Sequence, residues 1–152
     1  GLKSLIIDLP EVLTLSSALI MTLFPNKRIC LPNEIDDDTD LENYDFVLLF
    51  PNQIRRSESL VFDLAINISS FMEMELNEVR RYFRLITNQL SNGSYFFCRN
   101  RDKETLLKDY PWEESGQFEL VHRAPNGVLA NISPWNDVSF PKFIDDIRRL
   151  RN

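Results

Sequence analysis

Residues 62–98 read FDLAINISSFMEMELNEVRRYFRLITNQLSNGSYFFC, and this stretch decides the fold class. An apolar run over 62–68 precedes a helical segment, and a second apolar run covers 95–98. Such short continuous runs are typical of strands buried in a parallel sheet. The apolar residues of the helical segment recur every three or four positions and form one stripe: Leu76, Val79, Phe83, Ile86 and Leu90. Ser70 and Glu73 have the spacing of a helix capping box, which predicts that the helix begins there, and Asn92-Gly93 predicts its end.

The same alternation of strand and helix occurs earlier in the chain. Leu5-Ile6-Ile7 is a buried-type strand that ends at Asp8, and Pro10 opens a helix that runs to Phe24. The apolar positions of this helix recur every three or four residues: Val12, Leu15, Leu19 and Leu23. Strands around 28–31 and 46–50 follow, separated by an acidic loop. The pattern predicts an α/β fold with a mostly parallel sheet covered on both faces.

The last third of the chain predicts an antiparallel edge to this sheet. Residues 117–122 and 128–132 flank the turn signal at 125–127 and are expected to form a hairpin. A short helix is expected over 140–151, with apolar positions at Phe143, Ile144, Ile147 and Leu150. With 152 residues, of which 43% are hydrophobic, the chain is expected to form a single domain over residues 1–152.

Composition restricts the classes of function. The net charge of −6 argues against a nucleic-acid-binding surface, which normally needs a basic face. Cys30 and Cys98 stand apart in apolar runs, as free thiols of a reducing compartment do. No apolar run approaches the roughly 20 residues of a membrane span. We therefore expect a soluble cytoplasmic protein that binds neither nucleic acid nor membranes.

In open α/β sheets, ligands bind at the carboxyl ends of the strands. Around the predicted strand ends, this sequence resembles that of a known family. It is similar to the sugar O-methyltransferases, a branch of the class I S-adenosylmethionine-dependent methyltransferases with a Rossmann-like sheet. The residues that carry the likeness are Ile6-Ile7-Asp8-Leu9-Pro10-Glu11 with Phe24-Pro25, then 45–49, then 62–74, and finally Arg99-Asn100-Arg101 with Tyr110-Pro111-Trp112.

The resemblance implies a cofactor, S-adenosylmethionine, and a carbohydrate hydroxyl as methyl acceptor. Asp8 matches the acidic strand-end residue that accepts hydrogen bonds from the cofactor ribose, although an aspartate before a helix is also a common N-cap. Asn67, Ser69 and Ser70 match the loop that lines the methyl-transfer site, with the capping box as the competing interpretation. Asn52 is placed near the adenine or the acceptor, although Pro-Asn-Gln is also ordinary turn chemistry.

The sequence does not identify a catalytic base. Glu73 and His122 are candidates by residue type, since a base could remove the proton of the acceptor hydroxyl. An acidic cluster at Asp36, Asp37, Asp38 and Asp40 lacks the spacing of a calcium-binding loop, so no metal site is predicted. Trp112 and Trp135 are expected in the core rather than stacked on a sugar.

The sequence differs from the family at its N-terminal end. The family's first strand and its glycine-rich cofactor turn do not precede Leu5, so the first strand and helix of the sheet are expected to be missing. The strands at 5–7 and 62–68 would then lack their shared neighbour, which a further segment or an oligomeric partner would supply. The alternative is a non-catalytic Rossmann-like interaction module that has lost cofactor binding; a dehydrogenase fits the 67–74 segment less well.

Overall fold

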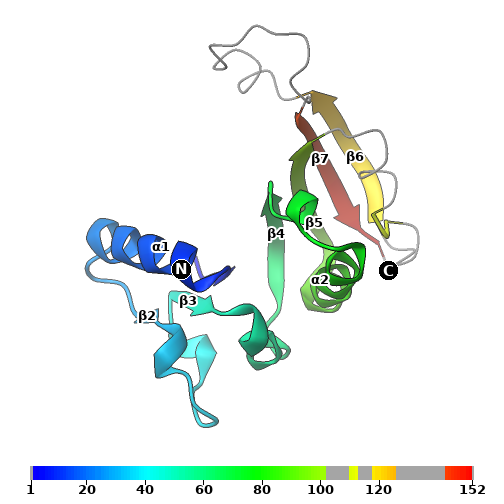
Figure 1. Ribbon diagram of the computed structural model, residues 1–152. Coiled ribbons are helices and arrows are strands. Elements are labelled where there is room, and N and C mark those ends of the chain that lie inside the picture. The colour runs from blue at the N-terminus through cyan, green and yellow to red at the C-terminus, as the bar shows by residue number, and fades with distance from the viewer. Residues whose placement is uncertain (1, 102–109, 113–117, 126–142, 152) are drawn as a thin grey trace, which may run out of the picture. The chain divides into compact units, whose positions relative to one another are not determined.

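The computed structural model describes residues 2–101, 110–112, 118–125 and 143–151 (Figure 1). The chain divides into two compact units, an N-terminal unit over 1–60 and a C-terminal unit over 61–152. Each unit has its own sheet. The architecture is α/β, as the sequence predicted, with one parallel sheet and one mixed sheet where the sequence predicted a single mostly parallel one.

The N-terminal unit is a three-stranded parallel sheet covered by a helix. Strand β1 (Ser4–Ile7) and strand β2 (Ile29–Cys30) both pair in parallel with β3 (Phe46–Leu49), which gives the order β1-β3-β2. Helix α1 (Pro10–Leu23) begins with a proline, whose fixed φ suits the first turn and whose missing N–H would be unpaired there. Three short 3-10 helices, Pro32–Glu34, Leu41–Asn43 and Pro51–Ser57, connect the remaining elements.

The buried face of α1 is not its predicted apolar stripe. Leu13 and Ile20 are buried and pack with Leu48 of β3. The stripe residues are instead exposed by 42% to 76%: Val12, Leu15, Leu19 and Leu23. The helix is apolar around much of its circumference, so periodicity alone does not identify the side that faces the sheet.

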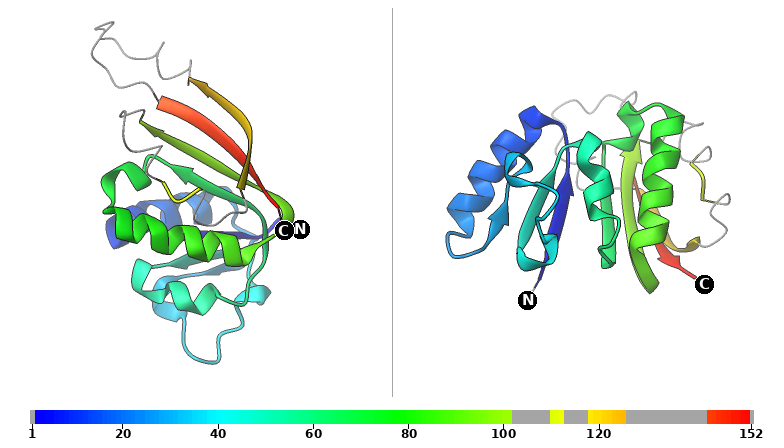
Figure 2. Two further views of the ribbon diagram at one scale, coloured as in Figure 1. Left: turned by 90° about the vertical axis from the view of Figure 1, so that its right-hand side faces the viewer. Right: turned by 90° about the horizontal axis from the view of Figure 1, so that it is seen from below.

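The C-terminal unit is a mixed sheet with a helix along one face (Figure 2). Strands β4 (Phe62–Ile68) and β5 (Leu90–Arg101) are parallel, and β7 (Phe143–Leu150) pairs antiparallel with both β5 and β6 (Phe118–Pro125). The order is β4-β5-β7-β6. Helix α2 (Leu76–Gln89) places Val79 and Phe83 in the core, as its stripe predicted.

Helix α2 begins later than the capping box predicted. Its N-cap is Glu75, and residues Phe71–Glu73 form a separate 3-10 turn in which Ser70 makes no side-chain cap. The predicted stop at Asn92-Gly93 is also wrong, because the chain enters β5 directly at Leu90, with Gly93 at φ 83° inside the strand. Within the described part of the chain, no helix has the length and apolarity that crossing a bilayer requires.

The helix predicted over 140–151 is a strand. Phe143–Leu150 forms β7, with Ile144, Asp146 and Leu150 buried on the face toward α2. The antiparallel edge exists among the described residues, where β7 pairs with β6. Residues 128–132 and Trp135 lie outside the described residues.

Aromatic rings dominate the core of the C-terminal unit. The ring of Phe83 lies 4.7 Å from Trp112 and 5.6 Å from both Phe71 and Phe96, measured between centroids. Trp112 is 5% exposed, which confirms its predicted place in the core. The cluster joins α2, β5 and the turn after β4 into one packed body.

Strands β1 and β4 each have one unpaired edge among the described residues. They are the two strands for which the sequence predicts a missing neighbour. Leu64, Ile66 and Ile68 of β4 are also more than half exposed. Native proteins usually pair or cover a strand edge of this apolar kind.

Both cysteines are expected to be inert toward thiol reagents in the folded protein. Cys30 and Cys98 are free thiols with no exposed surface. Burial raises the pKa of Cys98 to about 12 and also raises that of Cys30, so the reactive thiolate forms only above neutral pH. With Ellman's reagent at pH 8, we expect neither thiol to react rapidly in buffer. In about 6 M guanidinium, which unfolds most proteins, we expect both thiols to react. Rapid labelling in buffer would contradict the buried positions.

Candidate functional site

Asp8 lies at the carboxyl end of β1 and is not the cap of α1. Its carboxylate accepts a 2.8 Å hydrogen bond from the backbone N–H of Leu9, which is itself the N-cap residue. That N-cap has no side-chain cap bond, so the competing capping interpretation is wrong. The Asp8 backbone N–H donates to Leu49 O at 3.3 Å, which fixes the residue beside the end of β3. The carboxylate is partly exposed and can accept further donors.

The loop after β4 has a strained turn at the strand end. Ser69 has a φ of 62°, the left-handed region that non-glycine residues rarely adopt. Its N–H donates to Arg99 O at 2.7 Å, which ties the turn to the end of β5. Strain of this kind persists only where surrounding contacts impose it, and it often marks a functional site.

Ser70 bonds to Asn67 instead of capping a helix. The side-chain amide of Asn67, which is buried, donates to Ser70 Oγ. Glu73 is exposed on the same loop, and the bond from its N–H reaches the backbone carbonyl of Ser70 at 3.1 Å. The structure therefore places four sequence-predicted residues at the end of β4 and in the turn that follows it, a segment (67–73) called the β4 loop below: Asn67, Ser69, Ser70 and Glu73.

Asn100 is a buried residue of this region that the sequence named only as part of the Arg99-Asn100-Arg101 motif, without a role of its own. It lies on β5 with no exposed surface. Its amide nitrogen donates to Asn67 Oδ1 at 3.0 Å, and its oxygen accepts the N–H of Met72 at 3.2 Å. The only signal in the sequence is that Asn100 stands near a strand end between two arginines.

Those two arginines are engaged within the sheet. Arg99 makes two hydrogen bonds to the Asp145 carboxylate, at 2.6 and 2.9 Å, and this partner raises the pKa of Arg99. Arg101 lies with its guanidinium 5.8 Å from the centre of the Phe143 ring. The Arg99 guanidinium is thus occupied by Asp145, whereas the Nε of Arg101 is buried without a hydrogen-bond partner.

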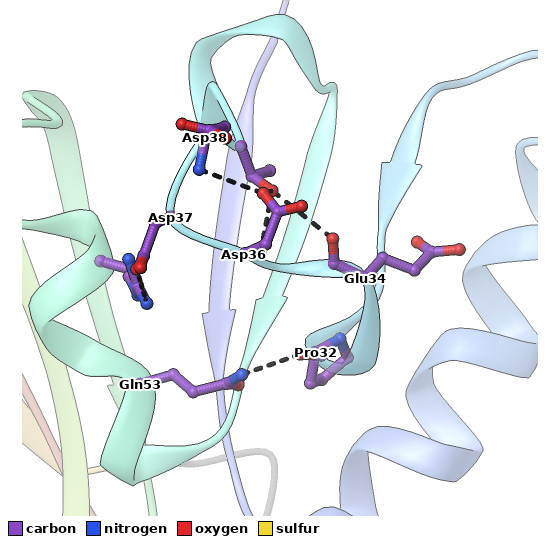
Figure 3. A network of polar contacts seen from close by, with 8 residues as sticks. Pro32, Glu34, Asp36, Asp37, Asp38 and Gln53 are labelled. Atoms are coloured by element: carbon purple, nitrogen blue, oxygen red, sulfur yellow. Dashed lines mark hydrogen bonds and ion pairs between the residues drawn. The ribbon is translucent and has the colours of Figure 1, made fainter.

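Asn52 and Gln53 follow β3 and differ in their contacts. Gln53 accepts the N–H of Phe50 at 3.0 Å and donates to Pro32 O at 2.8 Å, so its side chain joins two 3-10 segments (Figure 3). Asn52 is exposed. The side chain of Gln53 thus stabilises the fold, whereas the exposed side chain of Asn52 can contact a ligand, as the sequence predicted.

The acidic loop is organised by bonds among its own residues. Asp36 accepts from Thr39 Oγ1 at 2.6 Å and from the N–H of Asp38 at 3.1 Å, and Asp37 pairs with Arg56 (Figure 3). Asp40 accepts the N–H of Glu42. Among the described residues, no group of three or more His, Cys, Asp or Glu side chains is arranged to hold a metal ion.

His122 is remote from the loop after β4. It is exposed on β6, at the opposite edge of the β4-β5-β7-β6 sheet. Glu73, on the loop itself, is the better placed of the two candidate bases. Asp8 and Asn52 belong to the N-terminal unit, and the β4 loop belongs to the C-terminal unit.

Comparison with known proteins shows the fold. No family model and no curated protein matches the sequence. Among solved structures, the chain is similar to an rRNA methylase from Streptococcus thermophilus (TM-score 0.58, 13% identity, 99% of this chain and 74% of the other). It is also similar to an S-adenosylmethionine-dependent methyltransferase from Mesorhizobium loti (TM-score 0.57, 16% identity, 97% and 80%).

A third similar structure is that of a protein described as a methyltransferase and solved with S-adenosylhomocysteine (TM-score 0.59, 14% identity, 99% of this chain). The chain spans 40% of the length of that protein and 39% of the length of an S-adenosylmethionine-dependent methyltransferase from Streptococcus mutans. These likenesses establish a Rossmann-like α/β fold of the kind that methyltransferases have, which is the fold class that the sequence predicted.

Proposed function

We propose that the chain is the catalytic domain, or part of it, of an S-adenosylmethionine-dependent methyltransferase. The observation that carries the proposal is the likeness of 97% to 99% of the chain to solved structures whose names identify them as methyltransferases. Fold alone does not fix function, so the proposal also rests on the residues at the strand ends.

The Asp8 carboxylate is proposed to bind the ribose of the cofactor. It follows a parallel strand, its bond to Leu9 uses only one oxygen, and it does not cap α1. A carboxylate has several acceptor positions and can take two adjacent hydroxyls at once. Asn52, exposed just after β3, is proposed to contact the adenine or the acceptor.

The β4 loop is proposed to line the methyl-transfer site with Asn67, Ser69 and Ser70. The positive φ of Ser69 supports this, because a strained backbone at a strand end is an established mark of ligand-binding turns. Glu73 is the proposed base for the acceptor proton, since it is exposed on this loop. Methyl transfer is an in-line displacement, so a fixed loop geometry contributes by aligning donor and acceptor.

The proposed acceptor is a carbohydrate hydroxyl rather than a nucleic acid. The resemblance of the 62–74 segment to sugar O-methyltransferases supports the sugar, and the net charge of −6 weighs against a phosphate backbone. One similar structure is an rRNA methylase, so RNA is the competing acceptor in a test. Incubating the protein with labelled S-adenosylmethionine and either monosaccharides or total RNA distinguishes the two.

The edges of β1 and β4 that are unpaired among the described residues are each proposed to pair with a further parallel strand. Unpaired backbone groups in an apolar strand are costly unless another strand or a cover satisfies them. In the proposed enzyme, the glycine-rich cofactor turn would follow such a strand. Cofactor binding is therefore best measured on the full-length product of the gene as well as on the 152-residue chain.

Asp8→Ala is expected to weaken binding of S-adenosylhomocysteine about 10- to 100-fold. Hydrogen bonds to a charged acceptor contribute about 1.5–3 kcal/mol, and each 1.4 kcal/mol is a factor of about ten in Kd. The measurement is isothermal titration calorimetry on the full-length protein. Asp38→Ala is the matched control, because it removes one exposed aspartate from the same unit.

Each result of this titration has a distinct meaning. A weaker Kd for Asp8→Ala and an unchanged Kd for Asp38→Ala support the ribose assignment. Equal affinities in all three proteins would remove Asp8 from the site. No binding to the folded full-length protein would refute the methyltransferase proposal and favour a non-catalytic interaction module.

A further inference from the structure

We infer that Asn100 is the positioning residue of the β4 loop: it fixes the turn from Asn67 to Met72 on which the proposed cofactor and acceptor contacts depend. The role of this turn in binding rests on the proposed function, whereas the contacts of Asn100 with the turn are observed in the structure. Asn100 is fully buried and reaches both ends of the turn from the neighbouring strand.

Both halves of the Asn100 amide are used. The nitrogen donates to Asn67 Oδ1 at 3.0 Å and to Cys98 Sγ at 3.1 Å, and the oxygen accepts the N–H of Met72 at 3.2 Å. An aspartate has nearly the same shape but lacks the donor, while a leucine lacks both functions. Asparagine satisfies this arrangement at a site where an unpaired polar group would be expensive.

The contact with Asn67 extends to the serines. With its oxygen held by Asn100, Asn67 directs its amide nitrogen at Ser70 Oγ. Ser69, between them in sequence, adopts its positive φ with its N–H bonded to Arg99 O, next to Asn100. Asn100 therefore determines which way Asn67 is turned, and Asn67 in turn holds the Ser70 hydroxyl.

The turn is anchored independently by Phe71, which separates folding from positioning. Phe71 is 2% exposed, with its ring 5.6 Å from Phe83 and 6.2 Å from Phe96. Loss of the Asn100 contacts should leave this ring in the core. The turn on either side of Phe71 would then become loose without global unfolding.

The test compares Asn100→Asp with Asn92→Asp, a matched change at an exposed asparagine on the same strand. In Asn100→Asp the new carboxylate has no donor for Asn67 Oδ1 and repels that oxygen, which moves the aspartate side chain away from its place beside Met72. We therefore expect the Met72 amide to exchange with solvent at least about tenfold faster. We also expect S-adenosylhomocysteine to bind the full-length variant about tenfold more weakly. Asn92→Asp should change neither quantity.

A double-variant cycle distinguishes positioning from a general loss of stability. If Asn100 acts through Asn67, then Asn67→Ala combined with Asn100→Asp should weaken S-adenosylhomocysteine binding no more than either change alone. Additive losses would overturn the inference. If Asn100→Asp does not fold, Asn100→Ala, which adds no buried charge, replaces it in both measurements.

Failure of this inference and failure of the proposed function are separable. If the folded parent protein does not bind S-adenosylhomocysteine, the proposed function fails, and exchange of the Met72 amide alone then decides whether Asn100 fixes the turn. If the parent binds but Asn100→Asp keeps both its affinity and the slow Met72 exchange, the positioning role is refuted while the function stands.

Discussion

Replacing Phe83 by alanine is expected to lower the free energy of unfolding by about 3–5 kcal/mol. Phe83 is 2% exposed, and its ring packs against Phe71, Phe96 and Trp112. Alanine would leave a cavity among these rigid rings, which have little freedom to collapse into it. Urea denaturation followed by tryptophan fluorescence measures the loss, and Trp112 in the cluster reports on it.

Tyr95→Ala is the matched control for Phe83→Ala. Tyr95 is also aromatic and belongs to the same unit, but it is 43% exposed on β5. Its truncation removes less buried surface and should cost about 1 kcal/mol or less, as typical partly exposed positions do. Equal losses in the two variants would show that the ring cluster around Phe83 is not the main source of stability in this unit.

Phe83 illustrates what the sequence predicts well. Its neighbours in the apolar stripe of α2 recur every three or four residues, and the opposite side of the helix carries charged side chains such as Arg80, Arg81 and Arg84. The burial of Val79 and Phe83 follows from that contrast. Helix α1 has no such contrast, and there the sequence predicts the helix but not its buried face.

Strand β7 shows where periodicity misleads. Phe143, Ile144, Ile147 and Leu150 fit a helical pattern, and the charged residues between them do not alternate as an ordinary strand would. The structure buries Asp146 by pairing it with Arg123 from β6. In the sequence, a charged residue such as Asp146 is expected to be exposed. Its burial beside a cross-strand partner therefore conceals the alternation of buried and exposed residues that is typical of a strand.

The candidate site also contains residues whose positions the sequence predicts and residues whose positions it does not predict. Asp8 follows an apolar run directly, so its place at a strand end can be predicted from local sequence. Asn100 depends on partners 28 and 33 residues away, Met72 and Asn67. The capping box at Ser70 failed for a local reason: the side-chain amide of Asn67, three residues earlier, donates to the serine hydroxyl that the helix would have used.

Replacing Asp146 by alanine is expected to lower the free energy of unfolding by about 3–5 kcal/mol, the usual cost of removing one partner from a buried ion pair. Asp146 has no exposed surface, and its carboxylate lies 2.5 Å from the Arg123 guanidinium and 3.5 Å from that of Arg148. Arg148 is only 11% exposed and lies 4.0 Å from the centre of the Trp112 ring. Alanine would leave this guanidinium buried without its carboxylate.

Asp145→Ala is the control, because Asp145 is the next residue on β7 and points to the other face. Its partner Arg99 is more exposed, at 27%, and can be solvated when the carboxylate is removed. We therefore expect a loss of about 1 kcal/mol, near the upper value for solvent-accessible pairs. Urea denaturation of the two variants side by side measures the difference.

The difference between the two aspartates separates two sources of stability in this sheet. If Asp146→Ala loses several times more than Asp145→Ala, desolvation of Arg148 sets the cost, since the change in formal charge is identical. Similar losses would mean that the cross-strand bonds themselves contribute equally on both faces. The buried pair also fixes register, because a slip of one residue between β6 and β7 would turn Arg123 to the opposite face and leave Asp146 in the core without it.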